Sequence, residues 1–227
     1  MKKCILCFLM SMVMISGSFV ASAQYLKDPN GKEYMLQSYT EVEGTPFLIN
    51  NWAPGSVTLA NGQTITTLLK YDLVGDELLF KNKGDSSAMS FVDPVRSFSL
   101  NESSIEESDL TSLVFSNGYP AVDKQTPTSF YQVISDGKVK LLKHYKKVIR
   151  VDKAFNSATA VKTFFLSEEY YLFVNNQITK IKPGQKAILT VLADKTAQLQ
   201  KYMSINAMNY KSDDVLAKLF SYYNSLQ

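Results

Sequence analysis

The sequence predicts an α+β fold: a mainly antiparallel β-sheet, built as a curved meander or partial barrel, followed by two C-terminal α-helices. Apolar stretches separated by turn residues recur about every 8–12 residues over residues 34–182, which is typical of antiparallel sheets. After Pro183-Gly184 the apolar residues follow a helical period instead. The chain has 13 Tyr and 13 Phe residues among 227, and aromatic side chains favour strands.

The first 23 residues are expected to be a secretory signal peptide. Lys2 and Lys3 give a basic start, residues 5–20 are uncharged and mostly apolar, and Ala21-Ser22-Ala23 offers small residues for cleavage before Gln24. The alternative is a membrane anchor, which needs about 20 apolar residues and flanking charges. We therefore expect an exported protein, periplasmic, outer-membrane-associated or extracellular, with no transmembrane segment after cleavage.

Both cysteines, Cys4 and Cys7, lie within this signal. The mature chain is therefore expected to have no disulfide, no thiol nucleophile and no cysteine metal ligand. A lipoprotein would need a cysteine where Gln24 stands, so no lipid anchor is expected.

Turn residues divide residues 24–182 into the strands of one β-rich domain. Asn61-Gly62 and Asp136-Gly137 predict hairpin turns, and Asn175-Asn176 predicts a third tight turn. Residues 120–128, with two prolines, are expected to link two halves of the sheet, and residues 101–109 and 156–159 to form loops. The strands are expected at residues 47–52, 57–59, 64–72, 78–80, 89–92, 95–100, 113–115, 130–134, 139–151, 161–166, 170–174 and 177–181.

Residues 183–227 are expected to form a helical pair that packs on the sheet. The first helix is predicted over residues 187–203 and the second over residues 215–223, where Ser212-Asp213-Asp214 supplies the N-terminal cap. Each helix has one apolar stripe to bury, and a face of the sheet is the expected partner.

Several classes of site are not expected. The formal charge is only +3, and the signal carries Lys2 and Lys3, so nucleic-acid binding is not predicted. His144, the single histidine, lies among lysines in a strand, which favours neither catalysis nor a zinc site. Serine-hydrolase and nucleotide-binding motifs are absent from the sequence. We predict no catalytic residue, no metal and no cofactor.

Carboxylate pairs are the remaining candidates for catalysis, since a glycosidase needs two acids that flank one bond. The pair Asp72 and Asp76 brackets a turn, where Asp ordinarily caps its own backbone. The pairs are Asp72 with Asp76, Glu41 with Glu43, and Glu168 with Glu169.

A basic strip is the strongest charge feature of the sequence. It would bind an anionic partner such as lipid headgroups, or it would be the solvated face of a hairpin that discourages edge pairing. Trp52, the only tryptophan, is a candidate surface aromatic for a sugar or protein, with a core or corner position as the alternative. The strip consists of Lys138, Lys140, Lys143, Lys146, Lys147 and Arg150.

Several stretches of the sequence resemble exported β-rich proteins common in Bacteroidota. They are residues 52–57, 69–73, 76–80, 130–131 and 139–143, and the ending with Asp194-Lys195, Asp214 and Tyr222-Tyr223-Asn224. The resemblance covers most of the mature chain. It implies a Gram-negative cell envelope as the setting and assigns no catalytic or binding residue.

These observations predict a non-enzymatic binding or interaction protein of the cell envelope, whose partner is an envelope protein, a lipid or a glycan. One alternative is a carrier that holds a hydrophobic or lipid ligand in the curved sheet, which needs an internal cavity rather than bulky inward aromatics. The other is an envelope hydrolase, which needs two acids in one cleft with raised pKa values.

Overall fold

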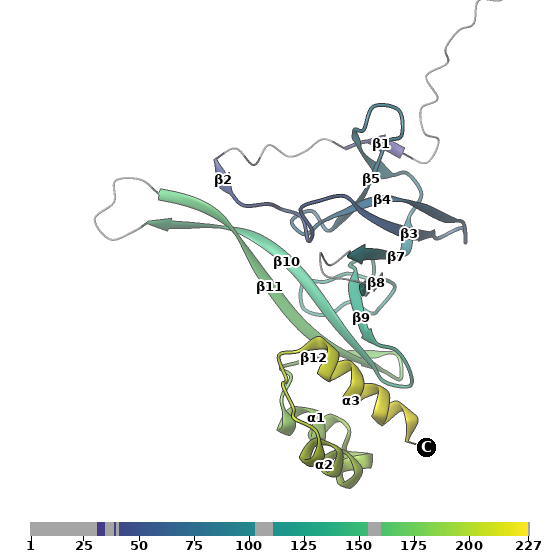
Figure 1. Cartoon of the computed structure of the whole chain (residues 1–227), viewed down its shortest axis with the longest axis vertical. Helices are drawn as coiled ribbons and strands as arrows, with labels where there is room; N and C mark the ends of the chain where they lie inside the picture. The colour runs from purple at the N-terminus through teal and green to yellow at the C-terminus, as the bar shows by residue number, and fades with distance from the viewer. Residues whose placement is uncertain (1–30, 35–38, 40, 103–110, 154–159, 227) are drawn as a thin grey trace, which may run out of the picture.

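The computed structural model describes residues 31–34, 39, 41–102, 111–153 and 160–226 (Figure 1). The predicted signal peptide lies outside these ranges, as do the loop expected at residues 156–159 and most of the loop expected at residues 101–109. In the described part of the chain, no helix is long and apolar enough to cross a membrane.

Strands make up most of the described chain, and the helices follow them. The strands are β1 (Gly31–Glu33), β2 (Val42–Glu43), β3 (Ala53–Leu59), β4 (Thr64–Asp72), β5 (Glu77–Lys81), β6 (Ala88–Phe91), β7 (Val95–Glu102), β8 (Thr111–Ser116), β9 (Tyr131–Ser135), β10 (Lys140–Lys153), β11 (Ala160–Val174) and β12 (Gln177–Ile181). The helices are α1 (Gln185–Val191), the 3-10 turn η1 (Ala193–Lys195), α2 (Thr196–Ile205) and α3 (Asp213–Ser225).

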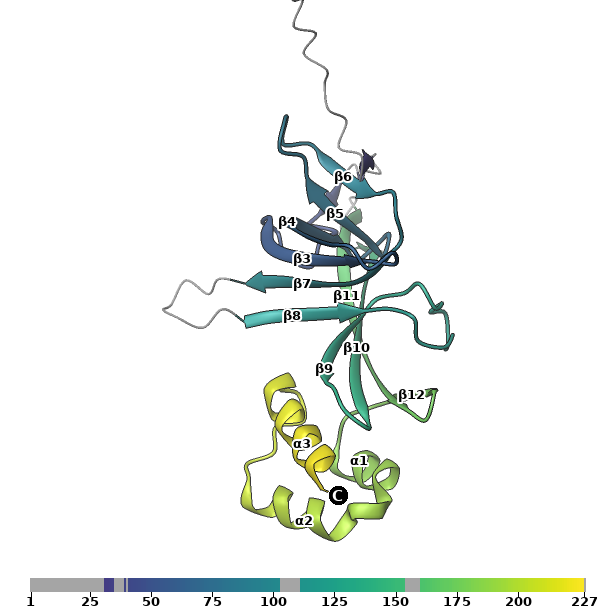
Figure 2. The same cartoon turned by 90° about the vertical axis from the view of Figure 1, so that its right-hand side faces the viewer.

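The described strands form one 12-stranded sheet in the order β1-β6-β5-β4-β3-β7-β8-β9-β10-β11-β12. Every ladder along this path is antiparallel, and β2 pairs with β11 as a short parallel addition. The sheet curves but does not close, because β1 and β12 remain its two ends (Figures 1 and 2). The predicted α+β fold with a curved antiparallel meander is therefore confirmed.

The prediction for the first strands is wrong in one place. Residues 48–51 form bends and Phe47 makes only an isolated bridge with Asp72, whereas β3 begins at Ala53 and includes Pro54 and Gly55, which lie between the first two predicted strands. Pro54 fits because β3 has only β4 beside it there; the ladder with β7 begins at Gly55. A Cβ at Gly55 would lie 2.1 Å from the Ser99 carbonyl oxygen, so glycine permits the close approach of β3 and β7.

The longest ladder of the sheet is the hairpin of β10 and β11. It runs from Lys140 opposite Phe173 to Lys153 opposite Ala160, and β11 is one strand where two were expected. Figure 1 shows the far half of this hairpin projecting beyond the rest of the sheet, with β2 beside it. We call residues 146–153 and 160–167 the arm.

The interior of the protein consists of three apolar clusters. In the first, among β3 to β8, Phe98 stacks on Phe115 with ring centroids 4.7 Å apart, and Tyr71 and Phe130 meet them edge-on. Tyr145 of β10 also belongs to this cluster. The second cluster joins Val139, Leu141 and Leu172 to the helices, and the third contains Tyr119, Tyr131, Leu142 and Tyr171.

The C-terminal helices pack at one end of the sheet, below β9 and β12 in Figure 2. The predicted second helix is confirmed: Ser212 caps α3 by accepting a hydrogen bond from the Val215 backbone N–H. The prediction of a single first helix is wrong, because α1 ends at Val191 and the backbone of the next residue, Leu192, is not helical, before η1 and α2 follow. The break brings Asp194 to the Tyr223 hydroxyl of α3, 3.1 Å away.

Lys143 joins the hairpin to α3. Only 6% of the residue is exposed, and its Nζ lies 2.9 Å from Asp213 Oδ2 and 3.0 Å from Glu168 Oε1. Asp213 is the first residue of α3 and also accepts a hydrogen bond from the Tyr170 hydroxyl. Burial alone lowers the pKa of Lys143, but the hydrogen bonds to Asp213 and Glu168 outweigh it and raise the pKa above its usual value.

Replacing Lys143 by Met is expected to lower the free energy of unfolding by about 2–3 kcal/mol, because two charged partners lose a buried cation. Lys140→Met is the matched control on the same strand. Among the described residues, Lys140 forms one ion pair, with the exposed Asp136, and its loss should cost less than about 1 kcal/mol. Urea unfolding measures both, and equal losses would contradict the role given to Lys143.

Candidate functional site

The candidate site is a pocket of about 680 Å³ on one face of the β10–β11 hairpin. We call it the hairpin pocket. The loop between β8 and β9, predicted as a linker, folds over this face and contributes Asp123, Lys124, Gln125 and Ser129 to its lining. Leu73, Val74 and Asp76, in the turn between β4 and β5, line another side.

The alternation of side chains along a strand decides which residues of the hairpin face this pocket. On β10 they are His144, Lys146, Val148 and Arg150. Their partners across the ladder, Glu169, Ser167, Phe165 and Thr163, lie on the same face of β11, and the first three line the pocket. Lys143 and Lys147 therefore point to the opposite face.

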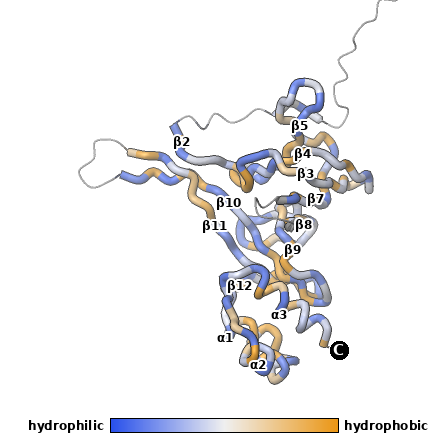
Figure 3. The backbone as a smooth tube through the Cα atoms, in the orientation of Figure 1, coloured by the Kyte–Doolittle hydropathy of each residue, from blue (hydrophilic) through white to orange (hydrophobic). Residues whose placement is uncertain are grey.

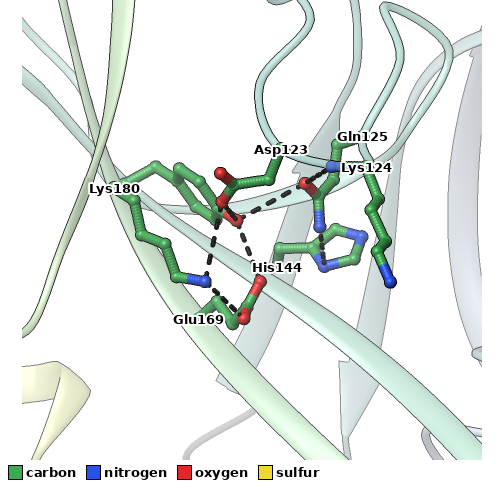
Figure 4. Close-up of polar contacts among 7 residues, drawn as sticks. Asp123, Lys124, Gln125, His144, Glu169 and Lys180 are labelled. Carbon is green, nitrogen blue, oxygen red and sulfur yellow. Dashed lines mark hydrogen bonds and ion pairs between the residues drawn. The ribbon is translucent and has the colours of Figure 1, made fainter.

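One end of the hairpin pocket holds a paired polar network (Figure 4). The Lys180 Nζ lies 2.6 Å from Glu169 Oε1 and 3.6 Å from Asp123 Oδ2. The Tyr171 hydroxyl lies 2.9 Å from Glu169 Oε2 and 3.3 Å from Asp123 Oδ2, so its single proton favours Glu169. The hydrogen bond from Lys180 is the main cause that lowers the pKa of Glu169, so this carboxylate is ionised at neutral pH.

His144 lies between this network and the β8–β9 loop. It is 5% exposed, and its Nδ1 lies 3.4 Å from Gln125 Nε2. Gln125 Oε1 accepts from the Lys124 backbone N–H, which turns the amide NH₂ towards the imidazole and makes Nδ1 the acceptor. Burial lowers the pKa of His144, with Lys146 and Lys180 acting in the same direction against Asp76 and Glu169. The imidazole is therefore neutral at neutral pH.

The other end of the pocket carries cations beside an apolar wall. The guanidinium of Arg150 lies 3.2 Å from the ring centroid of Phe165, and Val148 stands next to them. Among the described residues, Lys124, Lys146 and Arg150 have no carboxylate partner. This end of the pocket can bind an anion.

The six cations of the predicted basic strip do not share one surface. Lys138 is exposed in the turn before β10, and Lys140 pairs with Asp136. Lys143 is buried against α3, and Lys147 donates to the backbone carbonyls of Thr45 and Phe47, 2.9 and 2.6 Å away. Only Lys146 and Arg150 line the hairpin pocket, where Lys124 and Lys180 join them.

Trp52 lies away from the hairpin pocket. It is partly buried just before β3, and the Lys70 Nζ lies 5.5 Å from its ring and 4.4 Å from the ring of Phe47. These contacts agree with the corner position that was the alternative to a binding role.

The predicted carboxylate pairs do not form a catalytic pair either. Asp72 Oδ1 accepts hydrogen bonds from the backbone N–H groups of Val74 and Gly75, as expected for turn capping. Glu168 and Glu169 lie on opposite faces of β11, where they pair with Lys143 and Lys180. Glu41 and Glu43 are exposed at β2.

Asp123 and Glu169 are the acids that do converge, and they were not among the predicted pairs. Asp123 belongs to the stretch predicted as a linker, and its φ of 52° marks a tight turn that holds it over the hairpin. The position of Lys180 has a signal in the sequence: the Asn175-Asn176 turn sets β12 against β11, which places Lys180 opposite Tyr171. Within the described residues, no group of three or more His, Cys, Asp or Glu side chains is placed to hold a metal ion.

Comparison of the chain with protein-family models, with curated proteins and with solved structures gave no match. The resemblance to exported Bacteroidota proteins stays a prediction from the sequence.

The wild type is expected to lose stability in mild acid because of His144, and His144→Gln is expected to abolish this loss. Because burial lowers the pKa of His144 below the 6.5 of a free side chain, the unfolded chain binds the proton first as pH falls. The free energy of unfolding should then decrease below about pH 6.5, by up to about 1.4 kcal/mol per pH unit.

Urea unfolding of the wild type and His144→Gln between about pH 7 and pH 5 measures this difference. Carboxylates with lowered pKa values, such as Glu169 and Asp136, lose their contribution only at lower pH. An unchanged pH slope in His144→Gln would show that the imidazole is not kept neutral by burial.

Proposed function

We propose that this protein is an exported, non-enzymatic binding protein of the cell envelope. We further propose that its hairpin pocket binds the anionic group of an amphiphilic envelope component. The observation that carries this proposal is the set of three cations, Lys124, Lys146 and Arg150, that lack a carboxylate partner among the described residues and lie beside an apolar wall.

The chemistry of the wall favours an anion that is attached to an apolar group. The Arg150 guanidinium lies against the ring of Phe165, so its planar set of N–H donors is held beside the apolar wall, where it can bind a phosphate or carboxylate. Val148 and Phe165 offer exposed apolar surface next to it. A pocket of about 680 Å³ lies within the size range of small-molecule sites, which is roughly 300–1,000 Å³.

The ionisation of Glu169 supports binding rather than hydrolysis. A carboxylate-dependent hydrolase needs one acid with a raised pKa to donate a proton. The pKa of Glu169 is lowered instead, and its two oxygens are engaged by Lys180 and Tyr171.

The packing of the sheet supports a surface pocket rather than a carrier cavity. Tyr71, Phe98, Phe115 and Phe130 contact one another edge-on or stacked within the first apolar cluster. These rings fill the space among the N-terminal strands in which a carrier would hold an acyl chain.

The proposed export is supported by the sequence of residues 1–23 alone: a basic start, an apolar stretch and small residues before Gln24.

Reversing the charge of two pocket cations, Lys146→Glu with Arg150→Glu, is expected to weaken the binding of dodecyl phosphate by at least about tenfold. Isothermal titration calorimetry on the mature chain, below the micellar concentration, measures this. Dodecyl maltoside, which has the same chain and no charge, should bind much more weakly than the phosphate.

Lys138→Glu is the matched control, because Lys138 belongs to the same basic run but lies outside the pocket lining. It should leave the affinity within about twofold of the wild type. The proposal fails if the wild type does not prefer the phosphate, or if Lys138→Glu weakens binding as much as the double reversal.

Expression of the whole chain in a Gram-negative host is expected to give a protein whose mass begins at Gln24. Ala23→Phe places a bulky residue at the cleavage position and should leave the signal attached. Ser22→Phe is the matched control, because the middle residue of the small-x-small pattern is free to vary. Intact mass spectrometry separates the outcomes, and a wild type that keeps residues 1–23 would contradict export through a cleavable signal.

A further inference from the structure

The arm of the hairpin exposes apolar side chains where it leaves the rest of the protein. In Figure 3 hydrophobic and hydrophilic colours alternate along the arm. Large exposed apolar patches on a soluble protein usually mark an interaction surface. The exposed apolar residues of the arm lie on both of its faces: Val148, Val161 and Phe165 on the face of the pocket, and Ile149, Val151 and Leu166 on the opposite face. Val151 is 62% exposed.

The outer edge of β10 is open along this arm. The ladder with β9 ends at Lys143, and the Lys147 backbone N–H then donates to the Leu73 carbonyl oxygen, 3.1 Å away. Since backbone groups point alternately to the two sides of an antiparallel strand, those of Ile149, Val151 and Lys153 point outward like that of Lys147. Within the described residues, no strand pairs with these groups.

The charge of the arm indicates what kind of strand would fit this edge. The arm has one acidic residue, Asp152, and five cationic residues. The cations are Lys146, Lys147, Arg150, Lys153 and Lys162. Opposite charges on adjacent strands stabilise pairing, and like charges oppose it. An acidic strand fits this edge, whereas the arm of a second copy would bring the same cations.

The arm already binds one strand of this character at its other edge. β2 pairs with Lys162 and Thr163 of β11, and it lies in the sequence Glu41-Val42-Glu43, in which acidic and apolar residues alternate. The same hairpin therefore shows how an acidic, extended segment is added to it.

A lipid bilayer is a less suitable partner for this surface than an added strand. Insertion into hydrocarbon would leave the outward N–H and C=O groups of Ile149, Val151 and Lys153 without partners, at a cost of several kcal/mol each. An added strand pairs the same groups while its side chains cover the apolar residues.

We propose that the open edge of β10, from Val148 to Lys153, accepts an extended acidic segment of a partner protein as an added strand. The added strand supplies backbone hydrogen bonds to Ile149, Val151 and Lys153. Its acidic side chains lie beside Arg150 on one face, and its apolar side chains cover Ile149 and Val151 on the other. This surface shares only Val148 and Arg150 with the hairpin pocket, so it does not depend on the ligand proposed there.

The probe is a synthetic peptide that alternates Glu and Val, patterned on residues 41–43, with a peptide that alternates Lys and Val as its control. Amide hydrogen exchange of the mature chain by NMR is expected to show new protection at Ile149, Val151 and Lys153 when the acidic peptide is added. The amides of Val148 and Arg150 already face β11 and should change little.

Val151→Pro removes one outward N–H and leaves the bonds to β11 in place. This substitution should weaken the binding of the acidic peptide by about tenfold, the equivalent of about 1.4 kcal/mol. Val151→Thr keeps the branched shape and the N–H, so it should retain most of the affinity. Both variants should bind dodecyl phosphate like the wild type, which separates this edge from the hairpin pocket.

Three results would overturn the proposal. The first is equal protection by the acidic and basic peptides, or by neither. The second is full affinity of Val151→Pro for the acidic peptide, which would place the contact on side chains alone. The third is binding to phosphatidylglycerol vesicles without binding to the acidic peptide, which would make the arm a membrane-binding element.

Discussion

β10 is the strand on which the rest of the structure depends, because it contributes to all three apolar clusters. On one face Leu141 meets the helices and Tyr145 meets the aromatic rings of the N-terminal strands. On the other face Leu142 packs with Tyr131 and Tyr171, and His144 follows it into the hairpin pocket. A shift of register by one residue would exchange these faces and place lysines in two apolar clusters. The ladder with β11 fixes that register from Lys140 to Lys153.

The same alternation explains why lysines that are close in the sequence have different roles. Lys143 faces the helices, and burial there requires the carboxylates of Asp213 and Glu168. Lys147 lies on the same face but past the helices, where backbone carbonyls are its acceptors. Lys146 points the other way, to solvent at the pocket. The role of each lysine is decided by the face of the strand to which it points and by the element that covers that face. The number of lysines close together in the sequence does not decide it.

Much of the fold follows from local signals, and most of the candidate site does not. Asn61-Gly62, Asp136-Gly137 and the Ser212 cap act within a few residues of themselves, so the hairpins and α3 could be predicted. The break after α1 could not, because Ile188, Leu192, Leu199 and Met203 would share one stripe on an unbroken helix as well; the contact of Asp194 with Tyr223 is tertiary. The pocket depends on a loop that folds back over the hairpin. Nothing in the local sequence of Asp123 and Gln125 specifies that they will meet His144 and Glu169.

The arm raises a separate question of stability, since a two-stranded hairpin alone is marginally stable in water. Lys147 holds the base of the arm by donating to the carbonyls of Thr45 and Phe47, and further out β2 extends the β11 edge at Lys162 and Thr163. Beyond Lys147, the β10 edge has no such support among the described residues. Backbone groups in an exposed strand are hydrated, so the open edge costs little while it stays in water. The apolar side chains beside it gain free energy only when something covers them. A partner strand does both at once, because it orders the outer half of β10 and buries Ile149 and Val151 against its own side chains.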